Sequence, residues 1–151
     1  MFCLSCHETY LFPPRRPSVH DGLRIVAEYG LAFDMLLTPD TLCHVPLVAS
    51  TVPDLRIVID HLAKPRYAQD EIEEWAQGIK QAAKFGNVHL KLSGMINEVD
   101  PWNPRAFQLY VDVCLLAFGE DRYKEVQFRS LGCDFNHFLG ASLALTGPCV
   151  D

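Results

Sequence analysis

Apolar segments alternate with helical patterns along most of the chain, and this alternation constrains the fold more than any other feature. Segments 31–37, 55–60 and 88–93 have the length and apolar character of strands, and each precedes apolar residues at helical spacing. This order predicts a parallel sheet covered by helices. The unit length suits an open doubly wound sheet or a section of a (β/α) barrel. No Gly-x-Gly-x-x-Gly follows a strand, so nothing indicates dinucleotide binding.

The helical patterns have recognisable ends. Helices commonly begin at an Asp or Asn cap with Pro in the first turn, and they commonly end at a Gly. These signals predict helices at 21–30, 38–49, 70–86 and 103–119, with a kink at Pro46 in the second of them. A weaker pattern at 125–128 predicts a further strand.

The composition argues against two classes of partner. The formal net charge is -6 and the only adjacent basic pair is Arg15–Arg16, whereas nucleic-acid binding requires clustered Lys and Arg. No apolar run approaches the roughly 18 residues that span a bilayer, and the first residues lack the features of a secretory signal. We therefore expect a cytoplasmic domain, with most of its six cysteines reduced.

Polar residues follow two predicted strands, at the edge where parallel α/β folds bind ligands. Asp60 and His61 end one strand, and Ser93 and Gly94 end the next. A neutral imidazole at such an edge can bind a metal ion, polarise a carbonyl or transfer protons near neutral pH. The alternative is that Asp60 or His61 only satisfies a backbone group of the loop, and the residues alone leave both interpretations open.

Two charged residues interrupt the apolar strands. Asp34 lies in the middle of segment 31–37, where a carboxylate is costly unless it is paired. It is either a substrate contact or a partner in a structural hydrogen bond. Lys91 lies on the face of its strand opposite to three apolar residues. In a barrel that face points inward, which makes Lys91 a candidate to bind an anionic group or a carbonyl; otherwise Lys91 is solvated near the strand end.

The first residues contain a short metal-like pattern. Cys3, Cys6 and His7 resemble half of a zinc site, but no second pair of ligands follows at a suitable distance. We interpret the pattern as accidental, and a small zinc protein is the weakest of the functional hypotheses. The sequence also contains no nucleophile elbow, metalloprotease motif or P-loop.

Four sequence blocks in a fixed order carry a resemblance to a known superfamily. They are GLRIVAEYGLAFDMLL, PDLRIVIDHLAKP, NVHLKLSGMINEVD and YVDVCLLAFGEDR, and they lie between residues 22 and 122. The series resembles the amidohydrolase superfamily, and within it the branch of L-fuconolactonases and pyrone dicarboxylate lactonases. The parts DHLAKP and KLSG are the most specific.

This resemblance implies a (β/α)8 barrel that hydrolyses a sugar or pyrone lactone with an activated water. It gives His61 the role of polarising the lactone carbonyl, or of ligating a divalent ion such as zinc in metal-using relatives. Lys91, Ser93 and Gly94 belong to the KLSG block and would border the pocket. With Asp34, Lys91 and Ser93 are the candidates for substrate binding.

The chain departs from the superfamily pattern in two places. That pattern begins with a strand carrying a His-x-His pair, and no such pair occurs here. The superfamily pattern also has its general-base Asp soon after the FGEDR block. Here a distorted block, Gly132–Phe135, follows instead, and Asp134 is the candidate general base.

The length of the chain matches only part of a barrel. A full barrel needs about 250 residues, so 151 residues supply only its later half. We expect an irregular segment at 1–20, a partial (β/α) barrel at 21–130 and a divergent tail at 131–151. Because a half barrel exposes two strand edges, we also expect a homo-oligomer or a poorly folded chain. The main hypothesis is a lactone hydrolase, and the alternatives are an inactive fragment of one or an interaction partner of a full-length relative.

Overall fold

The computed structural model describes residues 2–5, 16–67, 72–94, 104–119 and 121–125. Within them, five parallel strands form one sheet in which each strand pairs with the next strand along the chain. The strands are β1 (Phe2–Ser5), β2 (Ala32–Leu36), β3 (Arg56–Asp60), β4 (Val88–Leu92) and β5 (Tyr123–Glu125). This order is that of a barrel section, because a doubly wound sheet reverses its strand order at a switch point.

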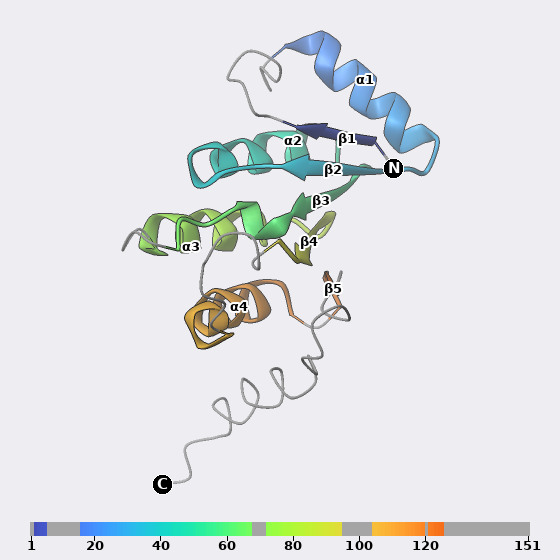
Figure 1. Ribbon diagram of the computed structural model, residues 1–151. Helices are drawn as coiled ribbons and strands as arrows, with labels where there is room; N and C mark the ends of the chain where they lie inside the picture. Colours follow the sequence, from blue (N-terminus) through green and yellow to red (C-terminus); the bar gives the residue numbers. More distant parts are fainter. Residues whose placement is uncertain (1, 6–15, 68–71, 95–103, 120, 126–151) are drawn as a thin grey trace, which may run out of the picture.

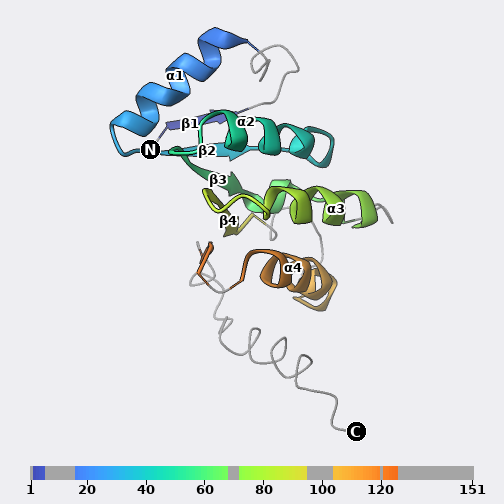
Figure 2. The ribbon, with the colours of Figure 1, turned by 180° about the vertical axis from the view of Figure 1, so that it is seen from behind.

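Helices connect the strands. They are α1 (Pro17–Glu28), α2 (Val45–Thr51), α3 (Ile72–Ala82) and α4 (Pro104–Phe118), with short 3-10 turns η1 (Pro39–His44) and η2 (His61–Ala63). In Figures 1 and 2 the strands descend the molecule in chain order from β1 to β4, and the helices do so from α1 to α4. The repeated strand–helix unit is the one that the sequence pattern predicts.

Several element boundaries differ from the prediction. Helix α1 begins at Pro17 rather than Asp21, because proline suits the first turn of a helix. Pro46 also lies in a first turn, that of α2, so the predicted kinked helix is a 3-10 turn followed by a short α-helix. Segment 1–20 contributes a strand and the start of α1, so the expectation of an irregular segment was wrong there. Strand β5 begins at Tyr123, before the predicted 125–128.

The core lies between the sheet and its helices. Alternate residues of β2, β3 and β4 are buried there and meet apolar residues of α2, α3 and α4. The largest fully buried side chains include Trp75 of α3 and Phe107 of α4. Cys114 of α4 belongs to the same core, and burial raises the pKa of its thiol, so that Cys114 stays uncharged.

Two polar side chains tie the loops at the amino ends of the strands. The Asn87 amide donates to the carbonyls of Ala49, Val52 and Leu55, at 3.3, 3.4 and 3.0 Å. Arg122 Nη1 donates to the carbonyls of Ala83 and Phe85 at 2.9 and 3.0 Å. In (β/α) barrels the amino ends of the strands contribute to stability, and the active site lies at the opposite, carboxyl ends. None of the helices that the structure describes is long and apolar enough to cross a membrane.

Candidate active site

The sheet face that points away from the helices carries a buried charge cluster. Alternation places Asp34 of β2, Asp60 of β3 and Lys91 of β4 on this face, opposite to the core residues of the same strands. Lys91 Nζ lies 2.6 Å from Asp34 Oδ2 and 2.7 Å from Asp60 Oδ1. One ammonium therefore bridges carboxylates on two other strands. Asp34 thus has the partner that a carboxylate buried in an apolar strand needs. Lys91 is buried in this ion pair and is not solvated.

The cluster is nearly closed to solvent. The side chains of Asp34, Asp60 and Lys91 are 3%, 7% and 12% exposed. Burial disfavours the charged ammonium, but the hydrogen bond to Asp34 and the charges of both carboxylates outweigh burial and raise the pKa of Lys91. Lys91 is therefore a fixed positive charge at neutral pH.

His61 and Ser93 meet at the carboxyl edge, next to this cluster. His61 follows the last residue of β3, and Ser93 follows the last residue of β4. The two strands are neighbours, and His61 Nδ1 lies 2.8 Å from Ser93 Oγ. Ser93 is 6% exposed, whereas His61 is only half-buried. The pair thus presents an oriented imidazole at the edge where barrel enzymes do their chemistry.

An unusual backbone turn positions His61. Four consecutive residues, His61 to Lys64, have left-handed backbone with φ of 52, 53, 57 and 46°. Each costs roughly 1–2 kcal/mol relative to right-handed backbone. Leu62 and Ala63 are fully buried, and the Trp75 indole N–H donates to the Leu62 carbonyl at 2.7 Å. Tertiary contacts therefore hold the turn against its local preference, as is common at functional sites.

Gly94 makes room for the imidazole. Its φ is +78°, and a Cβ built on it would lie 2.8 to 2.9 Å from His61 Cβ, Cγ and Nδ1. Those distances are well inside van der Waals contact, so His61 packs directly against the Gly94 backbone. The glycine of the KLSG block is thus required by the histidine of the DHLAKP block.

Replacing Gly94 with Ala is expected to destabilise the protein by about 1–3 kcal/mol through overpacking, in addition to the cost of left-handed backbone. Urea denaturation followed by circular dichroism measures the loss. Gly30→Ala is the matched control, because Gly30 also has positive φ, +64°, but its Cβ would meet nothing within 4 Å. Equal losses in the two variants would contradict the contact between Gly94 and His61.

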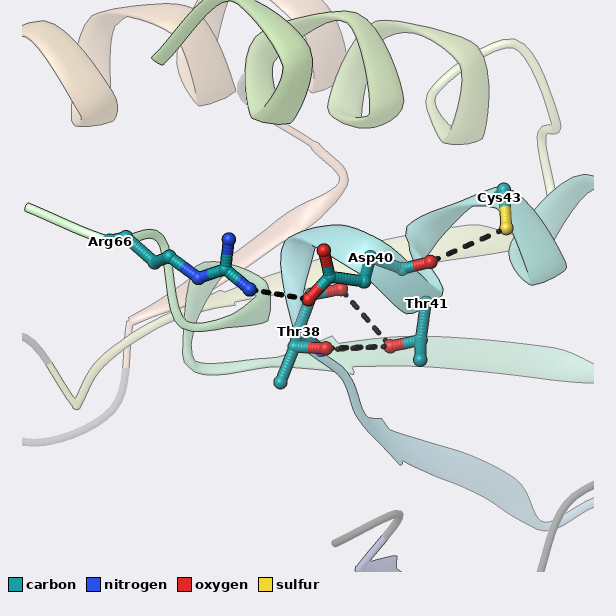
Figure 3. A network of polar contacts seen from close by, with 5 residues as sticks. All are labelled: Thr38, Asp40, Thr41, Cys43 and Arg66. Atoms are coloured by element: carbon teal, nitrogen blue, oxygen red, sulfur yellow. Dashed lines mark hydrogen bonds and ion pairs between the residues drawn. The ribbon is translucent and has the colours of Figure 1, made fainter. Parts of the chain in front are cut away.

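A second polar network lies on the surface of the loops that follow β2 and β3. Figure 3 shows the Thr41 hydroxyl bonded to the Thr38 backbone and Arg66 paired with Asp40. Arg66 Nη2 and Asp40 Oδ2 are 2.6 Å apart. The Arg66 and Asp40 side chains are 43% and 61% exposed, so this ion pair contributes at most about 1 kcal/mol. The network links two loops and offers no buried group for chemistry.

The described residues do not by themselves fit a metal centre. Among them, no three His, Cys, Asp or Glu side chains are arranged to hold an ion. The two neighbouring buried carboxylates, Asp34 and Asp60, already share the Lys91 ammonium, which takes the place of a cation between them. His61 alone supplies one nitrogen, whereas zinc sites use three or four protein ligands. The metal-ligating role of His61 therefore stays a prediction.

The structure brings together most of the predicted site residues. Asp34 and Lys91 are bonded to each other, His61 is bonded to Ser93, and their roles toward a substrate remain predictions. Asp134 lies outside the described residues, as do Cys6 and His7 of the zinc-like pattern. The sequence names Asp60 only as a polar residue at a strand end beside His61, and the structure shows that it is the second carboxylate against Lys91 Nζ.

Comparison with known proteins gives both a family and relatives. The profile of the amidohydrolase family matches residues 4–123. An L-fucono-1,5-lactonase of Burkholderia ambifaria is 40% identical over 85 residues, which are 56% of this chain and 29% of the relative. An uncharacterised protein of Sinorhizobium fredii is 29% identical over 118 residues, 76% of this chain and 40% of the relative. The chain thus spans less than half the length of these curated relatives.

Solved structures confirm the predicted fold class, a partial (β/α)8 barrel. An amidohydrolase from Burkholderia multivorans with bound zinc superposes with a TM-score of 0.69 at 20% identity, over 87% of this chain and 50% of that one. A putative 2-pyrone-4,6-dicarboxylic acid hydrolase from Pseudomonas putida gives 0.60 at 16% identity, over 98% and 56%. Since the family profile covers most of the chain and the fold agrees, the protein belongs to the amidohydrolase family.

Proposed function

We propose that this chain takes part in the hydrolysis of a sugar lactone or a related lactone, with His61 polarising the lactone carbonyl. The observation that carries the proposal is the placement of His61 at the carboxyl edge, where a strained turn, Ser93 and Gly94 fix its ring. A side chain held by a strained backbone and by several contacts is typical of a group that must meet a reacting atom. The likeness to an L-fucono-1,5-lactonase supports a lactone as the substrate class.

In this mechanism, a water attacks the lactone carbonyl carbon, and negative charge develops on the carbonyl oxygen. A proton of His61 donated to that oxygen stabilises the tetrahedral intermediate. A general base, for which Asp134 is our candidate, takes the proton of the water. The bond to the ring oxygen then breaks, the ring oxygen takes the proton that the general base removed from the water, and the product is an open-chain hydroxy acid.

Lys91 is the proposed substrate-binding residue of the charge cluster. Its ammonium has three protons, of which one is donated to Asp34 and another lies on the side of Asp60, whose Oδ1 forms an ion pair with Nζ at 2.7 Å. The third can bond to a hydroxyl or carboxyl oxygen of the substrate. Asp34 is too buried to meet a substrate directly, so in this proposal it acts by orienting Lys91.

The test is an assay of ring opening with a panel of aldonolactones and pyrone lactones. The reaction is monitored by the acid that it releases at constant pH. We expect opening above the spontaneous rate for at least one sugar lactone, and Asp134→Asn should reduce it by about 10²–10⁴-fold. Size exclusion and a thermal melt of the same sample show whether the chain is folded and whether it self-associates.

A second candidate function is a non-catalytic fragment or a partner of a full-length relative. The 151 residues span 29% and 40% of the curated relatives and supply no His-x-His pair, so these residues alone lack one part of the superfamily's catalytic pattern. A cooperatively folded sample that opens none of the lactones would support this candidate. Mixing that sample with a full-length relative would then distinguish a binding partner from an inert fragment.

A further inference from the structure

The bond between His61 and Ser93 can be made in two ways, and they give His61 different chemistry. Either the Ser93 hydroxyl donates to a bare Nδ1, or a protonated Nδ1 donates to the hydroxyl oxygen. In a neutral ring, the first arrangement leaves the proton on Nε2, the nitrogen that faces away from Ser93. The second leaves Nε2 as a bare lone pair, suited to a base or a metal ligand.

The surroundings of Ser93 decide between these arrangements. Ser93 is 6% exposed, and among the described residues its hydroxyl has no hydrogen-bond partner except His61 Nδ1. If Nδ1–H donated the bond, the buried Ser93 proton would lack an acceptor within this part of the chain. Leaving a buried donor unsatisfied costs about 1–3 kcal/mol, which is enough to set a tautomer.

We propose that the Ser93 hydroxyl donates to His61 Nδ1 and so holds the neutral imidazole as its Nε2–H tautomer. Ser93 is then a positioning residue, and its predicted role as a substrate contact is replaced by one exerted through His61. A 180° flip of the ring would bring a carbon opposite Ser93 Oγ and lose the bond. Packing against Gly94, where a Cβ would lie 2.9 Å from the ring atoms Cγ and Nδ1, holds the imidazole in its plane.

The role of the Nε2–H group in lactone hydrolysis rests on the proposed function, whereas the assignment of the tautomer does not. A neutral Nε2–H is a hydrogen-bond donor, so it suits a developing oxyanion on a lactone carbonyl. It cannot accept the proton of an attacking water at Nε2, nor ligate a metal there without first losing its proton. His61 is therefore the electrophilic group of the site, and the general base has to be another residue.

The experiment is a long-range ¹H–¹⁵N NMR spectrum of the uniformly ¹⁵N-labelled chain at pH about 8, above the ordinary imidazole pKa of about 6.5. The His61 ring is assigned by its disappearance in His61→Asn. We expect its ¹⁵N shifts to report a protonated Nε2 and a bare Nδ1. In Ser93→Ala the His61 shifts should move towards the tautomer mixture of a free imidazole, and Ser93→Thr should restore the wild-type pattern.

Ser50→Ala is the matched control, because Ser50 is an exposed serine on α2 whose hydroxyl donates to the Leu47 carbonyl. It should leave the His61 shifts unchanged. A protonated Nδ1 in the wild-type chain, or identical His61 shifts in wild type and Ser93→Ala, would overturn the proposal. Neither outcome depends on turnover, so an inactive chain with the expected tautomer would count against lactone hydrolysis alone.

Discussion

Replacing His61 with Asn is expected to lower kcat for lactone opening by about 10²–10³-fold, the usual effect of removing one hydrogen-bond donor to an oxyanion. Asn removes the imidazole, and it is also among the residues that best tolerate left-handed backbone, which His61 adopts with φ of 52°. The variant should therefore keep the left-handed turn, although losing the bond to the buried Ser93 hydroxyl costs about 1–3 kcal/mol. Its denaturation curve shows whether it is folded under the assay conditions, and only then is a loss of activity assigned to the imidazole.

The measurement combines steady-state kinetics, on the lactone that the wild type opens fastest, with a urea denaturation curve for each variant. His44→Asn serves as the control, since His44 is the last residue of η1, in the connection after β2, and does not lie at the β3–β4 edge. It should change kcat less than twofold. If His61→Asn retained wild-type kcat, His61 would not be the carbonyl-polarising group.

Replacing Lys91 with Met is expected to destabilise the protein by about 3–5 kcal/mol at neutral pH. Met has a similar volume, but it leaves Asp34 and Asp60 buried without their shared cation. Lys84→Met is the control, because Lys84 is exposed, follows the end of α3 and donates from Nζ to the Gln81 side chain at 2.7 Å. That substitution should stay within about 0.5 kcal/mol. Both values come from urea denaturation, and a small effect of Lys91→Met would contradict the role of Lys91 as the cation that compensates the two buried carboxylates.

The same cluster predicts a pH dependence in the wild type. Because the folded-state pKa of Lys91 is raised above its ordinary value of 10.5, its stabilisation is fully present below that pH. Stability should then fall as the pH rises through the folded-state pKa. Unfolding curves between pH 9 and 12, with Lys91→Met as the reference lacking this group, measure the fall.

The sequence predicts the repeated unit well, because parallel strands buried on one face leave a strong periodic signal. Segment 88–93 alternates cleanly, and β4 is found there with the core residues on the expected face. Boundaries are less well predicted where proline is involved, as at Pro17 and Pro46, since proline both starts and interrupts helices.

The sequence predicts which residues belong to the candidate site, but it does not predict how their side chains and backbone are arranged. The cost of burying Asp34 shows that it needs a partner, yet its partner Lys91 lies 57 residues away and two strands across the sheet. The left-handed turn at His61 has no local signal, because none of its four residues is glycine. Both features are decided by contacts that form only when distant segments pack together.

That turn has a consequence for how activity is lost. Its conformation is disfavoured locally, so it persists only while Trp75 of α3 and Gly94 after β4 stay docked against it. Mild denaturant that loosens α3 releases the turn first, and the His61 ring loses its orientation while most of the sheet is still paired. Inactivation should therefore run ahead of global unfolding, and amide hydrogens of the turn should exchange faster than those of β3 and β4.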